Sequence, residues 1–200
     1  MHMPKQFLHV GCGPQTKHRL KGFSSDEWQE IRFDIDPAVQ PDIIGTLTDM
    51  HAVPTASVDA IFSSHNIEHV FPHEVILVLK EFHRVLKDDG FVVITCPDLQ
   101  SVCEAVVKDK LLDPLYVSPA GPISPIDILY GHRGFIANGN TYMAHKCGFT
   151  LNTISSDFQA AEFISVFGLR RPTAYDLWLV VSKQEKTQAE MRELATKFFP

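Results

Sequence analysis

Short apolar runs separated by turn residues recur through the first half of the chain. Strands are predicted at residues 7–10, 31–35, 42–45, 58–63 and 91–96. The run at 91–96, FVVITC, is continuously apolar and rich in β-branched residues, as in a central strand covered on both faces. Several runs end abruptly at glycine or at Asp-Pro, which are typical turn residues.

Residues 74–87 carry an apolar stripe at helical spacing between the last two of these strands. The stripe consists of Val75, Val78, Leu79, Phe82, Val85 and Leu86. Asp88-Asp89-Gly90 is expected to end the helix, with Gly90 in the left-handed conformation. A strand, a helix and a strand with short connections imply parallel strands and a right-handed crossover.

The regular pattern breaks down at residues 110–145. Four of the 13 prolines lie between Pro114 and Pro125, and several glycines follow. A structureless stretch this long inside a small domain is usually a lid or binding loop, so we expect it to cover the substrate. Strands at 162–167 and 177–181, joined by residues 168–172, and an amphipathic helix at 185–199 complete the chain. That helix is expected to pack on its own domain, and an exposed apolar side would favour a homodimer.

Composition narrows the class of protein. The length of 200 residues suits one domain spanning 1–200. The net charge of −6 and the lack of a long basic run argue against binding to nucleic acid or to an anionic membrane. No apolar run approaches the roughly 18 residues of a membrane span. Residues 1–6 have no apolar core of a signal peptide, and the four cysteines form no C-x-x-C pair, so we expect reduced thiols and a cytoplasmic location.

Three features fall at predicted carboxyl ends of strands, where open parallel sheets bind ligands. Gly11-Cys12-Gly13 follows the first strand, and glycines there let a ligand approach the backbone. Asp34 ends the second strand, where an acid can accept hydrogen bonds from a ribose diol. Asp49-Met50 follows the third strand, and a carboxylate beside an apolar side chain suits an adenine ring.

The segments FLHVGCG, RFDIDP, LTDMHAVP, VDAIFSSHNIEHV and LKEFHRVLKDDGFVVITCPDL, in this order, resemble the small class I S-adenosylmethionine-dependent methyltransferases. The resemblance covers residues 5–100. It implies a Rossmann-like, doubly wound α/β fold: a mostly parallel seven-stranded sheet with an antiparallel last strand and helices on both faces. It also implies S-adenosylmethionine as cofactor and S-adenosylhomocysteine as product.

The resemblance implies a role for each matching residue. The glycine loop, Val10, Gly11, Cys12 and Gly13, would approach the methionine part of the cofactor. Asp34 would hold the ribose hydroxyls with Ile35 against the adenine, which Asp49 and Met50 would flank. The sulfonium end would be lined by Ser63, Ser64 and His65. The loop departs from the family pattern, because His9 replaces the usual acid and Gln15 replaces a third glycine.

Methyl transfer to a hydroxyl or an amine also needs a base, and histidine suits this role near neutral pH. The candidates are His65, His132 and His145, and His132 is favoured because it lies in the loop expected to cover the site. Tyr130, Arg133 and Asp98 are expected to contact the acceptor, a small molecule. This interpretation includes no metal ion.

Three alternatives remain. His65-Asn66-Ile67-Glu68-His69 matches the zinc-peptidase signature H-x-x-E-H, which requires a helix through the motif and a third ligand on a later helix. A nicotinamide dehydrogenase would have a third glycine where Thr16 stands. The third alternative is a methyltransferase-like module that has lost turnover and serves as a binding domain.

Overall fold

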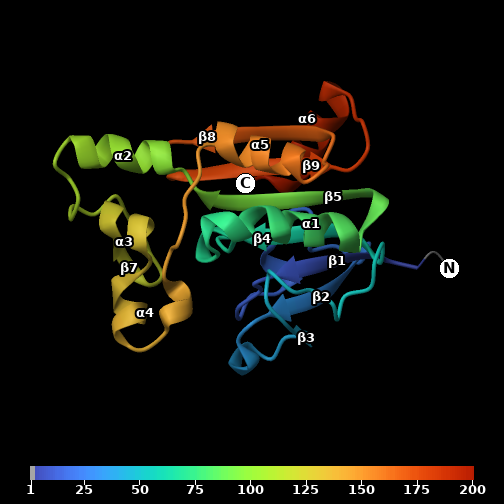
Figure 1. Cartoon of the computed structure of the whole chain (residues 1–200), viewed down its shortest axis with the longest axis horizontal. Coiled ribbons are helices and arrows are strands. Elements are labelled where there is room, and N and C mark those ends of the chain that lie inside the picture. The colour runs from blue at the N-terminus through green and yellow to red at the C-terminus, as the bar shows by residue number, and fades with distance from the viewer. Residues whose placement is uncertain (1–2) are drawn as a thin grey trace.

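The computed structural model describes residues 3–200 and contains a seven-stranded sheet in the order β3-β2-β1-β4-β5-β9-β8 (Figure 1). The strands are β1 (Lys5–Val10), β2 (Trp28–Asp34), β3 (Ile43–Ile44), β4 (Val58–Ser64), β5 (Leu86–Pro97), β8 (Ser165–Arg171) and β9 (Asp176–Ser182). The first five pair in parallel, and β9 runs antiparallel to both β5 and β8. The predicted mostly parallel, Rossmann-like sheet is therefore confirmed.

Helices and short turns connect the strands. The α-helices are α1 (Val75–Val85), α2 (Leu99–Val107), α3 (Pro125–Tyr130), α4 (Arg133–Ala137), α5 (Leu151–Ala160) and α6 (Gln188–Phe198). A separate hairpin joins β6 (Tyr116–Ser118) to β7 (Gly121–Ile123). Single 3₁₀ turns lie at Lys17–Arg19, Pro37–Val39, Ile67–His69, Pro72–Glu74 and Thr141–Met143. None of the helices within residues 3–200 is both long and apolar enough to span a membrane.

Two apolar cores lie on opposite faces of the sheet, because side chains alternate along each strand. Val92 and Ile94 of β5 belong to the core that includes Phe82 of α1 and residues of α5. The neighbouring Val93 belongs to the other core, which includes Phe198 of α6. Helices therefore cover both faces, as predicted.

The C-terminal helix α6 buries its apolar side inside its own chain. Met191, Ala195 and Phe198 are all nearly inaccessible and pack with Phe7 and Trp28. The expectation of a packing helix is therefore confirmed.

The end of α1 differs from the sequence prediction. The helix stops at Val85, β5 begins at Leu86, and Gly90 lies within the strand without a positive φ. A Cβ atom at Gly90 would lie 2.7 Å from Cγ of Leu86 and 3.0 Å from the carbonyl oxygen of Asp59. Gly90 is thus required by close packing and not by a left-handed helix exit, so that prediction was wrong.

Four α-helices, α2 to α5, have no counterpart in the predicted elements. Asp98 caps α2 and Thr150 caps α5, each accepting a hydrogen bond from a backbone N–H of its first turn. Strand β8 also continues through residues 168–171, which were expected to be a connection, with Gly168 close to Leu151 of α5.

Residues 110–145 are not structureless, because they contain β6, β7, α3 and α4. They lie beyond the carboxyl ends of the parallel strands (Figure 1), and their role as a cover over the substrate stays a prediction.

Candidate functional site

The glycine loop after β1 is fastened to the end of β2 by backbone hydrogen bonds. The amides of Gly11 and Cys12 donate to the carbonyl oxygen of Phe33, at 2.8 and 3.3 Å. The amide of Gly13 donates to Oδ2 of Asp34 at 2.8 Å. The loop runs on into a single 3₁₀ turn at Lys17–Arg19. Its shape therefore depends on β2 and not on a following α-helix.

The two glycines of the loop have different surroundings. Gly11 has a φ of +59°, and a Cβ atom there would lie 1.9 Å from Nδ2 of Asn66. That amide nitrogen donates to the carbonyl oxygen of Val10 at 2.8 Å. Gly13 has a φ of +50°, and no atom of residues 3–200 lies within 4 Å of the Cβ position. The side chain of Asn66 thus explains why residue 11 is a glycine. The open space at Gly13 fits a ligand lying against the backbone.

Asp34 lies at the carboxyl end of β2 and is 8% exposed. Its Oδ1 accepts from the amide of Asp36 at 2.9 Å, in addition to the bond between Oδ2 and Gly13. Each carboxylate oxygen has a second acceptor site, so these bonds do not exhaust the group. The neighbouring Ile35 is 39% exposed. The roles of Asp34 at a ribose and of Ile35 at an adenine ring stay predictions.

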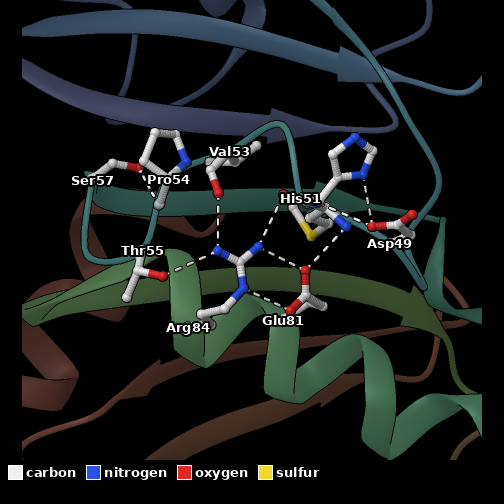
Figure 2. A network of polar contacts seen from close by, with 9 residues as sticks. Asp49, His51, Val53, Pro54, Thr55, Ser57, Glu81 and Arg84 are labelled. Carbon is white, nitrogen blue, oxygen red and sulfur yellow. Dashed lines mark hydrogen bonds and ion pairs between the residues drawn. The ribbon is translucent and has the colours of Figure 1, made fainter.

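The segment after β3 is held by a guanidinium group from α1 (Figure 2). Arg84 donates to the carbonyl oxygens of Met50 and Val53, at 2.9 and 3.0 Å. Glu81 accepts from the amide of Met50 at 3.0 Å and pairs with Arg84 at 2.7 Å. This network fixes the backbone that carries Asp49 and Met50.

The side chains of that segment point in different directions. Met50 is fully buried in the core, whereas the side chain of Asp49 is 65% exposed and lies 2.9 Å from Nδ1 of His51. The contact with His51 lowers the pKa of Asp49. The Asp49 carboxylate is thus available to a ligand at the surface, while the Met50 side chain lies beneath it.

The predicted sulfonium end follows β4. Ser63 is buried, and its hydroxyl has no hydrogen-bond partner in the described part of the chain. Ser64 is half-buried, and His65, whose φ is +52°, has a side chain that is 49% exposed. The amide of His65 donates to the carbonyl oxygen of Thr95 at 2.9 Å, which places it between the ends of β4 and β5.

A buried carboxylate lies next to His65. Oε1 of Glu68 is 3.4 Å from Nδ1 of His65, and the Glu68 side chain is 1% exposed. Burial raises the pKa of Glu68, but His65 and then His69 and His145 outweigh burial and lower it. Burial likewise lowers the pKa of His65, but Glu68 outweighs it and raises the value. The motif HNIEH therefore forms an acid and base cluster at the end of β4.

The zinc-peptidase arrangement of this motif is not formed. Ile67–His69 is a single 3₁₀ turn, and His65 precedes it in a left-handed conformation. The two histidines at 65 and 69 are thus not on one face of an α-helix, as that alternative requires.

The predicted acceptor residues are spread over different surroundings. Asp98 is fully buried: Oδ1 caps α2, and Oδ2 accepts from Arg170 at 2.8 Å. Nδ1 of His132 caps α4 by accepting from the amide of Phe135 at 3.3 Å. These bonds give Asp98 and His132 structural roles that the sequence did not predict, and their catalytic roles stay predictions.

Tyr130 and Arg133 are nearer the surface. Tyr130 is 65% exposed and lines a pocket of about 230 Å³ together with His145 and Cys147. Arg133 is paired with Asp127, with Nε of Arg133 at 2.7 Å from Oδ1. Of the residues expected to contact the acceptor, Tyr130 is therefore the one that lines an open pocket.

A buried His–Glu pair occupies the place where the family carries an acid. His9 is 3% exposed, and its Nδ1 lies 2.6 Å from Oε1 of Glu30 on β2. Burial lowers the pKa of His9, although Glu30 acts in the opposite direction. Oε2 of Glu30 accepts from the amide of Lys17 at 2.9 Å. A carboxylate from the neighbouring strand thus lies beside the residue that replaces the family's acid.

Other contributors to the site were not found from the sequence. They are Asn66, Glu81, Arg84, Glu30 and Arg170, and each acts on a segment distant along the chain. The N-cap of α2 is the one contact that a local signal could have indicated, because Asp98 stands directly before the apolar segment Leu-Gln-Ser-Val.

Comparison with known proteins agrees with this geometry. Residues 8–94 match the family described as Methyltransferase domain. No curated protein matches the chain. In its fold, its glycine loop and this matching domain, the chain is similar to the class I S-adenosylmethionine-dependent methyltransferases, whose cofactor is S-adenosylmethionine.

Solved structures share the fold at low sequence identity. An S-adenosylmethionine-dependent methyltransferase from Mesorhizobium loti has a TM-score of 0.57 and 15% identity, with 89% of this chain and 90% of that chain covered. One from Archaeoglobus fulgidus has a TM-score of 0.55 and 13% identity, with 89% and 86% covered. The 1,6-didemethyltoxoflavin-N1-methyltransferase of Burkholderia thailandensis has a TM-score of 0.53 and 16% identity, with 91% and 72% covered.

Proposed function

We propose that this chain transfers the methyl group of S-adenosylmethionine to a small-molecule acceptor. The observation that carries the proposal is the bond between the Gly13 amide and Asp34, which joins the glycine loop to an acid at the carboxyl end of β2. The loop leaves open space at Gly13, and Asp34 and Asp49 offer acceptors for hydroxyl and amino groups. S-Adenosylmethionine bound there supplies a methyl group that is activated by the positive charge on sulfur.

The chain contributes mainly by orientation. Backbone amides and carboxylates at the ends of β1 and β2 would hold one reactant, and the pocket beside Tyr130 would hold the other. Fixing two reactants in line replaces an encounter with a step inside one complex, which can lower the barrier by several kcal/mol. His65, which follows β4, is the proposed base for the acceptor proton, with His132 as the other candidate.

A small-molecule acceptor is supported by two observations. The net charge of −6 disfavours binding to nucleic acid. The Burkholderia relative is named for a small-molecule acceptor, 1,6-didemethyltoxoflavin. The four free cysteines suit a reducing compartment, and a cytoplasmic location is part of the proposal.

Calorimetric titration with S-adenosylmethionine and S-adenosylhomocysteine tests the proposal. We expect micromolar binding by the wild-type protein and at least about tenfold weaker binding by Asp34→Ala, because one charge-assisted hydrogen bond contributes about 1.5–3 kcal/mol. Asp26→Ala, at an exposed aspartate, is the matched control. Absence of binding by the wild-type protein would favour the alternative of an inactive binding module.

A further inference from the structure

Three potential metal ligands come together at the carboxyl end of β4. Glu68 and His69 belong to the 3₁₀ turn after that strand, and His145 comes from the segment before α5. One ligand atom from each lies within 4.8 Å of the others. The two segments are joined by hydrogen bonds from the amides of Lys146 and Cys147 to the carbonyl oxygen of Glu68, at 2.8 and 3.3 Å. The backbone therefore holds the cluster together.

Both histidines are oriented by backbone carbonyl groups. Nδ1 of His69 lies 3.1 Å from the carbonyl oxygen of Ala144, and Nδ1 of His145 lies 2.6 Å from that of Ile128. Because a carbonyl oxygen only accepts, each Nδ1 carries the proton and donates it. In the neutral ring Nε2 then keeps its lone pair, which is the usual state of a metal-binding histidine.

The carboxylate of Glu68 has no hydrogen-bond partner in the described part of the chain. The side chain is 1% exposed, and neither oxygen accepts a hydrogen bond from any residue in the range 3–200. His65 lies 3.4 Å away, but that contact does not have the geometry of a hydrogen bond. A buried carboxylate without hydrogen bonds is costly, and a bound cation would compensate its charge. Glu68 is thus a second, independent indication of a ligand here.

We propose that Glu68, His69 and His145 bind one divalent transition-metal ion such as Zn²⁺. Two imidazoles and one carboxylate match the three protein ligands of catalytic zinc sites, which leave a fourth position open. Imidazole favours such ions over Mg²⁺ or Ca²⁺. No metal ion was expected from the sequence, in which the HNIEH motif directly follows a strand and Pro72 cuts short any helix. In the folded chain His145, from a loop, lies beside Glu68 and His69.

The role of the ion rests on the proposed function. His145 also lines the pocket beside Tyr130, so an ion bound there would lie next to the proposed acceptor. The acceptor class is therefore a molecule with a metal-ligating hydroxyl group. A cation favours loss of the hydroxyl proton, which His65, the base proposed above, would accept. The oxygen then forms a bond to the methyl carbon, while the carbon–sulfur bond breaks and its electron pair stays on sulfur.

Metal binding is tested directly on the whole chain after treatment with a chelator. Titration with Zn²⁺, and with Co²⁺ followed by visible absorption, should show one tightly bound ion per chain. Glu68→Gln and His145→Ala should each weaken binding by at least about 100-fold, since even loss of an outer-shell partner costs 10- to 100-fold. His18→Ala, at an exposed histidine, should bind like the wild-type protein.

Stability measurements separate metal loss from misfolding. Glu68→Gln keeps the side-chain shape and removes the buried charge, so the metal-free variant should have a Tm no lower than the metal-free wild type. Zn²⁺ should raise the Tm of the wild type and not that of the variant, because it binds the folded state. A wild type that binds no ion, or a variant that binds as tightly, would overturn the site.

The experiments distinguish failure of the metal site from failure of the proposed methyl transfer. A wild type that binds Zn²⁺ but not S-adenosylmethionine would support the metal site and contradict the proposed function. A wild type that binds S-adenosylmethionine but neither Zn²⁺ nor Co²⁺ would contradict the metal site alone.

Discussion

The side-chain amide of Asn66 occupies the space that a Cβ atom at Gly11 would need. The Nδ2 atom lies 1.9 Å from that position and 2.8 Å from the carbonyl oxygen of Val10, to which it donates. Asn66 follows β4, whereas Gly11 follows β1, and these two strands are neighbours in the sheet. The contact thus couples the glycine loop to the HNIEH motif.

Gly11→Ala should destabilise the protein by about 2–5 kcal/mol. The left-handed conformation contributes about 1–2 kcal/mol and the overpacking against Asn66 about 1–3 kcal/mol. Gly13 has a similar φ but open space around the Cβ position, so Gly13→Ala should cost only the roughly 1–2 kcal/mol of the left-handed conformation. Urea denaturation of both variants measures the difference. Adding Asn66→Ala to Gly11→Ala should recover part of the loss, and equal losses for the two glycines would contradict this account.

Arg84→Gln should loosen the segment that carries Asp49 and Met50. It removes hydrogen bonds to two carbonyl oxygens and to Glu81, and because the Arg84 side chain is 30% exposed we expect a loss of only about 2 kcal/mol. Lys87→Gln, which breaks a half-exposed ion pair with Asp59, should cost below about 1 kcal/mol. Cofactor affinity should fall for Arg84→Gln alone. Unchanged affinity would place this segment outside the cofactor site.

His9 should make stability depend on pH. Its pKa is lowered by burial in the folded protein, while the unfolded value is about 6.5. Below pH 6.5 the unfolded chain therefore takes up a proton that the folded chain does not, and the free energy of unfolding falls by up to about 1.4 kcal/mol per pH unit. The loss begins near pH 6.5 and levels off below the folded pKa.

His9→Asn isolates this contribution, because all other groups are shared with the wild type. Denaturation at several values between pH 7 and pH 5 should show a shallower decline for the variant. Parallel pH profiles for the two proteins would mean that His9 titrates alike in both states.

Asp98→Asn should destabilise the protein by about 2–3 kcal/mol. Breaking a buried ion pair typically costs 3–5 kcal/mol, and the figure is reduced here because the Arg170 side chain is 27% exposed. Arg170→Lys, which keeps the charge but loses the paired geometry with Asp98 and Ser101, should cost less. Thermal denaturation measures both. Loss of turnover without loss of stability would instead restore Asp98 as an acceptor residue.

Most of the sheet was predictable from the sequence, because strand and turn signals are local. The five parallel strands and α1 follow from apolar runs, helical spacing and glycine or Asp-Pro turns. The helix α5 was not predictable in this way, because only Ile154 and Phe158 of its residues are buried and they form a weak stripe. Gly90 was misinterpreted because its packing against Leu86 cannot be read from the neighbouring residues.

The sequence by itself determined the class of the site: the glycine loop, Asp34 at the end of β2 and the order of the motifs. Only the tertiary structure decided which side chains meet there. Asn66 reaches Gly11, Glu30 reaches His9, and His145 lies beside Glu68, 77 residues earlier in the chain. The physical reason is that periodicity reports the face on which each residue lies, whereas contacts between distant segments depend on strand order and on the packing of their loops.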